Sequence, residues 1–332
     1  MPGKEKITTE VIAAQLLDNY NLMVAQLVPV PYSADQHSRV FQADTPDGKS
    51  YFVKLRSDVF NPISVLLPHH LHKQGIEAVI PAIPANNDEL WVEKIDYKLI
   101  LYPHIRGLSA AEVDLTPLQW RTFGRTLSEI HRAVLPNNLR QRIPLQDYAP
   151  TWRRIVAEHL QGAETFDRND PTVQGLAELL TRERDTILTL VNRAESLAHK
   201  LENALLPPVL CHRDIHEANL LVAQDGNIYL ADWDDPILAP RECDLMFIGG
   251  GILGRWVEPQ QADWFYQGYG RVDIDRRAIA YFRCERIVTD IAIFSNRILR
   301  GVESLEGRQT YMDFLQSNFD PGGTIDIALV RT

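Results

Sequence analysis

The sequence predicts an α+β protein with a small β-rich N-terminal lobe and a larger, mainly helical C-terminal lobe. In the first third of the chain, short apolar runs rich in β-favouring residues are separated by Pro, Gly and Asp turn signals. After Gly107, apolar residues recur mainly at the spacing of amphipathic helices. The length of 332 residues is enough for roughly two domains at about 150 residues each. We therefore place the N-terminal lobe at 1–107 and the C-terminal lobe at 108–332.

Composition and charge narrow the class of protein. The chain has 45% hydrophobic residues and a formal net charge of −10, and most of the acidic excess lies after residue 107. This charge argues against nucleic acid or an anionic membrane surface as a partner, because both select clustered positive charge. Three widely spaced cysteines do not indicate a disulfide framework or a zinc site. No signal peptide or membrane-spanning run is visible, so we expect a cytoplasmic protein of unknown oligomeric state.

The N-terminal lobe is expected to form strands interrupted by one helix. Thr45-Pro46-Asp47-Gly48 predicts a hairpin turn, and the strand that follows places Lys54 on the face opposite Val53 and Leu55. The helix is expected over Pro62–Gln74, with Gly75 ending it. The expected strands are Leu22–Val30, Ser38–Ala43, Tyr51–Leu55, Glu89–Lys94 and Tyr97–Pro103.

The C-terminal lobe begins with a strong helix signal. Thr116-Pro117-Leu118-Gln119 combines an N-cap, a first-turn proline and a capping-box glutamine. His131 on this helix is read as a core histidine, and Asp244 as a group that supports the loop at 212–219. Further helical patterns cover Thr151–Leu160, Pro171–His199, Pro259–Gly268 and Arg276–Leu299.

One segment departs from the helical pattern and carries chemical groups. A short strand at 209–211 leads into a loop with Asp214 and Asn219, and a hairpin over 220–231 then ends at Asp232. Phosphoryl transfer to a hydroxyl needs a carboxylate for the acceptor, oxygen ligands for Mg²⁺ and a fixed cation for the phosphates. The carboxylate could be Asp214, and the oxygen ligands could be Asn219 and Asp232. The fixed cation could be Lys54 on the third strand.

The motif His-x-Asp-x-x-x-x-Asn, followed by a hairpin and a second Asp, matches the catalytic loop of protein kinases. The runs LCHRDIHEANLLV and IYLADWDD, with FGRTLSEIH at 123–131, resemble the aminoglycoside phosphotransferase and choline kinase family over roughly residues 20–300. The resemblance implies a bilobal protein-kinase-like fold and an ATP- and Mg²⁺-dependent enzyme that phosphorylates an alcohol group. It implies Asp214 as the catalytic base, Asn219 and Asp232 as metal ligands, and Lys54 as the phosphate-binding lysine.

The same resemblance assigns 102–107 to the hinge between the lobes. There the carbonyl of Pro103 and the N–H of Ile105 would bind adenine. Residues 32–38 would form the phosphate loop, so Ser33 and Ser38 are expected to present backbone N–H groups to the nucleotide.

Three positions depart from the family pattern. The segment 32–38 contains no glycine, and the helix at 62–74 contains no acid to pair with Lys54. Arg213 stands where the family usually has glycine. The short interval between Asp232 and Asp244 leaves no room for a protein-kinase activation segment, which favours a small-molecule acceptor.

The acceptor is expected to be an amine-containing small molecule, because Glu217, Asp234 and Asp235 surround the proposed metal ligands with negative charge. In length and detail the chain resembles family members that phosphorylate spectinomycin, an aminocyclitol antibiotic, and the resemblance implies a role in antibiotic resistance. The alternatives are a kinase for choline, ethanolamine, homoserine or methylthioribose, and a non-catalytic nucleotide-binding module.

Overall fold

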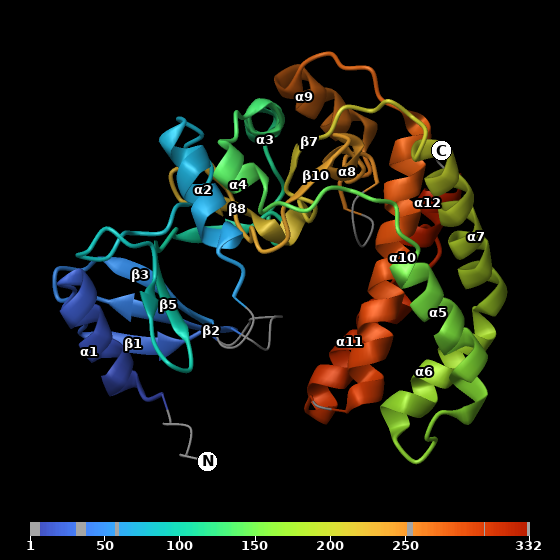
Figure 1. The fold of residues 1–332 in the computed structure, drawn as a ribbon, viewed down its shortest axis with the longest axis horizontal. Helices are drawn as coiled ribbons and strands as arrows, with labels where there is room; N and C mark the ends of the chain where they lie inside the picture. The colour runs from blue at the N-terminus through green and yellow to red at the C-terminus, as the bar shows by residue number, and fades with distance from the viewer. Residues whose placement is uncertain (1–6, 31–37, 57–59, 251–254, 302, 331–332) are drawn as a thin grey trace. The chain divides into compact units, whose positions relative to one another are not determined.

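The computed structural model describes residues 7–30, 38–56, 60–250, 255–301 and 303–330. The chain forms two compact units (Figure 1). The first unit comprises Met1–Leu115, Ala133–Ile143 and Ala218–Pro236, and the second comprises Thr116–Arg132, Pro144–Glu217 and Ile237–Thr332. The first unit therefore extends past the division at residue 107 that the sequence indicated, because the hairpin at 220–230 pairs with residues 107–109.

The first unit is built on an antiparallel five-stranded sheet of order β1-β2-β3-β5-β4. Its strands are shorter at the edges than expected, with only two residues in β4. The strands are β1 (Gln26–Pro29), β2 (Ser38–Asp44), β3 (Ser50–Arg56), β4 (Val92–Glu93) and β5 (Lys98–Pro103).

One face of this sheet is covered by α1 (Thr9–Tyr20), a helix that the sequence pattern did not predict (Figure 1). Ile12 and Leu16 of α1 are buried with Val53 and Leu55 of β3. Because side chains alternate along a strand, Lys54 faces the other side of the sheet. There Lys54 and residues of α2 (Ile63–Lys73) line a cavity, which is described below.

A second, three-stranded sheet of order β6-β8-β9 completes the first unit. It consists of β6 (Gly107–Ser109), β8 (Leu220–Ala223) and β9 (Ile228–Leu230), and the short α4 (Asn137–Arg140) contacts α2. A Cβ on Gly107 would lie 2.1 Å from the Val222 oxygen, so β6 approaches β8 as closely as it does only because Gly107 has no side chain.

The second unit is mainly helical and has its core around the 25-residue helix α10 (Arg276–Arg300), which begins at the N-cap Asp275. The helix α10 contacts α5, α7, α11 and α12 (Figure 1). The helices of this unit are α3 (Pro117–Arg132), α5 (Thr151–Gly162), α6 (Pro171–Arg182), α7 (Arg184–Leu201), α8 (Glu242–Leu245), α9 (Pro259–Tyr269), α10, α11 (Leu305–Ser317) and α12 (Thr324–Val330).

The expected capping box of α3 is confirmed, since Gln119 N–H donates to Thr116 Oγ1 and Thr116 N–H donates to Gln119 Oε1. The helix expected over Pro171–His199 is instead two helices, which meet at Glu183. In the same unit β7 (Val209–Cys211) and β10 (Ile237–Ala239) form a two-stranded antiparallel sheet.

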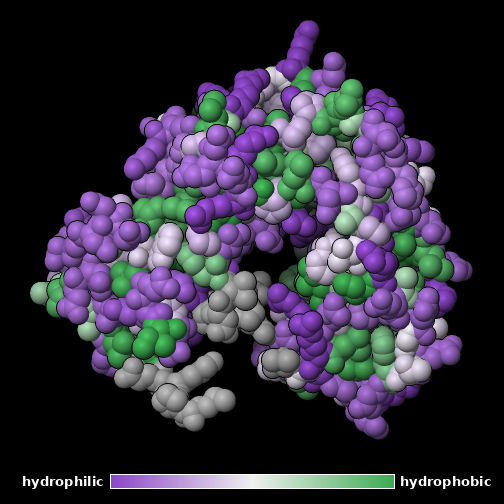
Figure 2. Space-filling model, in the orientation of Figure 1, coloured by the Kyte–Doolittle hydropathy of each residue, from purple (hydrophilic) through white to green (hydrophobic). Residues whose placement is uncertain are grey.

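In the view of Figure 2 the surface is mainly hydrophilic, and apolar side chains lie in small separate groups. Within the described residues, no helix is both long and apolar enough to cross a membrane.

Candidate active site

A cavity of about 280 Å³ lies within the first unit, between β2, β3, the end of β5 and the β8–β9 hairpin. It approaches the size of small-molecule binding sites in proteins. Most of its wall is apolar. Its two acidic residues, Asp232 and Asp234, lie in one short segment after β9, and its basic residue, Lys54, lies on β3. The cavity is lined by Val30, Val40, Phe52, Lys54, Ser64, Pro68, Ile80, Tyr102, Pro103, Ile105, Leu221, Leu230, Ala231, Asp232, Trp233 and Asp234.

The apolar part of the cavity contains the two residues expected to bind adenine. Pro103 ends β5 and Ile105 follows it, and both line the wall with Val40 and Leu221. No hydrogen bond of the Ile105 N–H is found within the described parts of the chain. An apolar cavity lined by a few polar groups suits a heteroaromatic base. Beside it, burial raises the pKa of Tyr102, so this phenol remains neutral.

Lys54 brings positive charge into this cavity. Its Nζ lies 3.2 Å from Asp234 Oδ2, and Arg56 Nη1 lies 3.0 Å from the same oxygen. Arg56 also donates to Ser38 Oγ at 2.9 Å. Ser38 is the first residue of β2 and is not among the described residues that line the cavity. Ser33, the other serine expected to bind phosphate, lies outside the described residues.

The two expected metal ligands lie at neighbouring points of the first unit. Asn219 immediately precedes β8, and its carbonyl accepts a hydrogen bond of 2.9 Å from Ala231 N–H, next to Asp232. Asp232 is exposed, lines the cavity and has a φ of 61°, in the left-handed region. An amide and an exposed carboxylate beside an apolar cavity are oxygen ligands of the kind that Mg²⁺ prefers, so these residues fit the ion.

Asp214 lies in the second unit, where it is paired with a cation. Its carboxylate forms an ion pair with Arg286 of α10, and His216 Nε2 lies 3.6 Å from it. Asp290, one turn further along α10, lies 3.1 Å from Arg286 Nε. Burial alone would raise the pKa of Asp214, but Arg286 and His216 hold it well below its usual range. The carboxylate of Asp214 is thus charged throughout the neutral pH range.

The loop that carries Asp214 is fixed by the buried Asp244. Its carboxylate accepts hydrogen bonds of 2.8 Å from His212 N–H and 2.7 Å from Arg213 N–H. Asp244 also contacts His131 Nε2 at 3.0 Å, and the other ring nitrogen of His131 lies 2.7 Å from the Tyr269 hydroxyl. His131, Asp244 and Cys211 are close enough together for a metal site. Because both histidine nitrogens already have partners, we read the cluster as structural.

The remaining predicted acceptor residues differ in their surroundings. Asp235 is exposed. Glu217 is only 4% exposed, and burial raises the pKa of its carboxyl group. The Asp234 carboxylate is partly buried and forms ion pairs with Lys54 and Arg56.

Sequence reasoning did not assign functional roles to Arg56, Arg286 and Asp290. Arg286 and Asp290 lie on α10, where Arg286 interrupts an otherwise apolar stripe formed by Ile279, Phe282 and Ile287. A charged residue on such a stripe indicates a buried partner of opposite charge. That signal was present in the sequence, but the identity of the partner required the fold.

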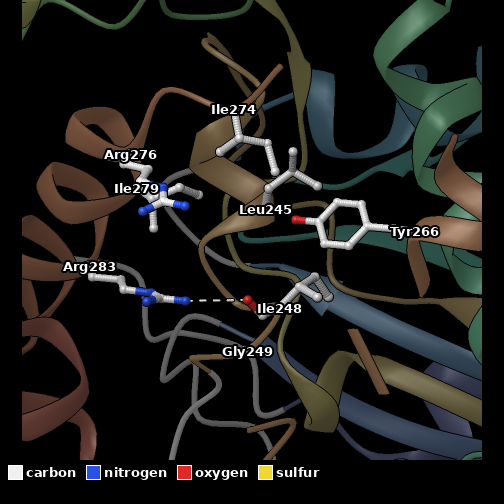
Figure 3. A pocket seen from close by; sticks show the side chains of 8 residues that line it. All are labelled: Leu245, Ile248, Gly249, Tyr266, Ile274, Arg276, Ile279 and Arg283. Carbon is white, nitrogen blue, oxygen red and sulfur yellow. Dashed lines mark hydrogen bonds between the residues drawn. The ribbon is translucent and has the colours of Figure 1, made fainter. Parts of the chain in front are cut away.

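A separate cavity of about 310 Å³ lies in the second unit, beside α9 and α10 (Figure 3). The Arg283 guanidinium projects from α10 towards Ile248, and its Nη2 donates to the Ile248 carbonyl at 3.3 Å. None of the predicted site residues lines this cavity.

Comparison with known proteins agrees with these observations. Residues 29–282 match the phosphotransferase enzyme family. The chain is 32% identical to spectinomycin phosphotransferase APH(9)-Ia in complex with ADP and spectinomycin, with a TM-score of 0.93 over 98% of this chain and 99% of that chain. An AMP-bound structure of the same enzyme gives a TM-score of 0.89 at 32% identity, with the same coverage.

An ethanolamine kinase of Plasmodium vivax, 14% identical over 95% of this chain and 90% of its own, shares the fold with a TM-score of 0.59. The kinase-like fold expected from the sequence is thereby confirmed. The chain is an ATP-dependent small-molecule phosphotransferase and belongs to the phosphotransferase enzyme family.

Proposed function

We propose that the enzyme transfers the γ-phosphate of ATP to a hydroxyl of spectinomycin or a closely related aminocyclitol, with Mg²⁺ as cofactor. The observation that carries this proposal is the cavity of the first unit, which is lined by Pro103, Ile105, Lys54 and Asp232 together. The similarity to spectinomycin phosphotransferase over almost the whole chain supports the choice of acceptor. Phosphorylation would inactivate the antibiotic and so give resistance.

The nucleotide would be held by groups of the first unit alone. Val40, Ile105 and Leu221 would enclose the adenine ring, while the Pro103 carbonyl accepts and the Ile105 N–H donates a hydrogen bond to its edge. Proline suits position 103 because only its carbonyl is needed there. Lys54 would donate from its ammonium group to the α- and β-phosphates.

Asp214 would accept a hydrogen bond from the acceptor hydroxyl and so orient it for attack. Its ion pair with Arg286 keeps the carboxylate charged and makes it a weak base. A weak base suffices because the transition state of phosphoryl transfer is loose, so catalysis depends mainly on positioning. Arg286 and Asp290 would therefore set the direction of the Asp214 carboxylate.

Asn219 and Asp232 would hold Mg²⁺ by their side-chain oxygens. Such an ion would neutralise negative charge that develops on the phosphate during transfer. The sequence motif itself links the two parts of the reaction, because Asp214 and Asn219 belong to one short loop.

The acceptor would be recognised by negative charge. Asp235 is exposed and available to pair with a protonated amine. Glu217, the other acid expected to bind the acceptor, is only 4% exposed, so we assign the amine to Asp235. We place the reaction in the cytoplasm, where ATP is supplied.

The test is ATP consumption with Mg²⁺ over a panel of acceptors that includes spectinomycin, choline, ethanolamine, homoserine and methylthioribose. We expect turnover with spectinomycin, and we expect D214A to lower kcat by about 10²- to 10⁴-fold because the hydroxyl loses its orienting group. ADP binding should survive in D214A, since Asp214 lies outside the cavity lining.

A matched control is D225N, which removes an exposed carboxylate in the turn of the β8–β9 hairpin. Turnover of D214A near the level of the unmodified enzyme would refute the assigned role. Faster turnover with choline or another alcohol than with spectinomycin would change the acceptor assignment. No ATP consumption with any acceptor, together with intact ADP binding, would favour a non-catalytic nucleotide-binding module.

A further inference from the structure

The structure raises the question of what holds Lys54 in place. A lysine carries its charge on a flexible four-carbon stem, so a phosphate-binding lysine needs a fixed partner. In protein kinases this partner is a glutamate on the helix of the small lobe. Here the corresponding helix α2 reads ISVLLPHHLHK and contains no acid. The residues that α2 gives to the cavity, Ser64 and Pro68, are neutral.

A carboxylate reaches Lys54 from a different part of the first unit. Asp234 accepts from Lys54 Nζ with both of its oxygens, at 3.2 and 3.4 Å. The side chains are 23% and 28% exposed, so solvent screens this pair less than it would a pair on the open surface. Both residues line the cavity in which we propose that the nucleotide binds.

Arg56 fixes the carboxylate from the other side. It lies two residues after Lys54 on β3, on the same face of the strand, and its side chain is only 11% exposed. It binds Asp234 Oδ2 at 3.0 Å and Ser38 Oγ at 2.9 Å. One carboxylate is thereby shared by two cations, so the group keeps a net positive charge. The ammonium of Lys54 has three donors, and those not used by Asp234 can serve phosphate oxygens.

The segment that carries Asp234 is anchored independently of the nucleotide. Trp233 is 4% exposed and lies between Asp232 and Asp234, and all three residues line the cavity. One buried side chain thus holds a proposed metal ligand and the partner of Lys54 in the same short segment.

We propose that Asp234 is the positioning residue of Lys54. It lies two residues after the proposed metal ligand Asp232, and it holds Lys54 in place of the acid that α2 lacks. This inference rests on the proposed function, in which the cavity binds a nucleotide. It assigns Asp234 to the phosphate side of the reaction instead of to the amine of the acceptor.

The experiment measures the binding of ADP and of adenosine by calorimetry, without turnover, for D234N, D234E, K54A and the double variant D234N/K54A. We expect D234N to weaken ADP binding by about 10-fold, the effect of a lost hydrogen bond to a charged group, and to change adenosine binding less than about 2-fold. The double variant should bind ADP no more weakly than K54A, because Asp234 acts through Lys54. D234E keeps the carboxylate and should retain most of the preference for ADP.

In steady-state assays D234N should raise KM for ATP and leave KM for the acceptor unchanged. D96N is the matched control, because Asp96 is an exposed aspartate of the same unit and lies outside the cavity lining. Unchanged ADP binding in D234N, additive losses in the double variant, or a raised KM for the acceptor alone would each overturn the inference. If the unmodified protein binds neither ADP nor adenosine, the proposed function itself fails, and this outcome is distinct from the others.

Discussion

Arg213, directly before Asp214, has a φ of 75°, in the left-handed region that costs a residue with a Cβ about 1–2 kcal/mol. The backbone is held there because Arg213 N–H donates to the buried Asp244 at 2.7 Å. Glycine would adopt this conformation without that cost, because it has no Cβ. The loop geometry is therefore maintained here at some cost in stability.

We expect R213G to be more stable than R213A by about 1 kcal/mol in chemical denaturation, because only glycine adopts this φ without strain. Both variants remove the guanidinium group, so their difference reports on the backbone alone. An R213A variant as stable as R213G would show that position 213 is not strained.

The charged residues of the candidate site are visible in the sequence, but their ion-pair partners are not. The spacing of Asp214, Asn219 and Asp232 follows from the local chemistry of one loop and one hairpin. The ion pairs Lys54–Asp234 and Asp214–Arg286 join residues far apart in the chain, so only tertiary packing could identify them.

At the scale of elements, α3 and α9 pack with their backbones in close contact. A Cβ on Gly124 of α3 would lie 2.0 Å from the Phe265 oxygen, and one on Gly268 of α9 would lie 1.9 Å from the Arg121 oxygen. The two glycines therefore allow the helices to approach from both sides. This packing supports His131 and Tyr269, which belong to the same two helices and contact each other.

We expect G124A to lower the stability by about 1–3 kcal/mol, because the added methyl group must displace the backbone of α9. The control is G175A in α6, where the nearest neighbour of a new Cβ is the Met312 side chain at 3.7 Å. Since alanine favours helix, G175A should be neutral or stabilising by up to about 1 kcal/mol. Equal thermal unfolding midpoints for the two variants would contradict this account.

Elements with strong local signals were predicted well, and those fixed by packing were not. The capping box and the wide apolar stripe of α3 predict that helix from the sequence. The helix α1 buries only Ile12 and Leu16, so its apolar stripe is narrow and gives a weak signal. No glycine or proline marks the end of α6 at Arg182, so the helical pattern of the sequence runs on from α6 into α7 without a visible break.

At the scale of the whole molecule, neither unit is one continuous stretch of chain. The first unit takes up Ala133–Ile143 and Ala218–Pro236 in addition to its N-terminal part. Periodicity and composition change near residue 107, so the sequence indicated a division there. It could not show that the β8–β9 hairpin returns to β6.

A fragment of residues 1–107 should therefore not bind ADP, although it contains Lys54, Pro103 and Ile105. It lacks the part of the cavity wall formed by 221–234. Calorimetry on the fragment and on the full chain under the same conditions would test this. Binding of ADP by the fragment with the affinity of the full chain would contradict the division into units.

The pairing of β6 with β8 also determines when the cavity can form during synthesis. Residues 107–109 can pair only after residues 221–223 have been synthesised. At a translation rate of about 5–20 residues per second, synthesis of the intervening chain takes roughly ten seconds. Until then the apolar wall around Val40 and Ile105 is uncovered on the ribosome. The nascent chain consequently exposes this apolar surface for that interval, and nucleotide can stabilise it only after the hairpin has emerged.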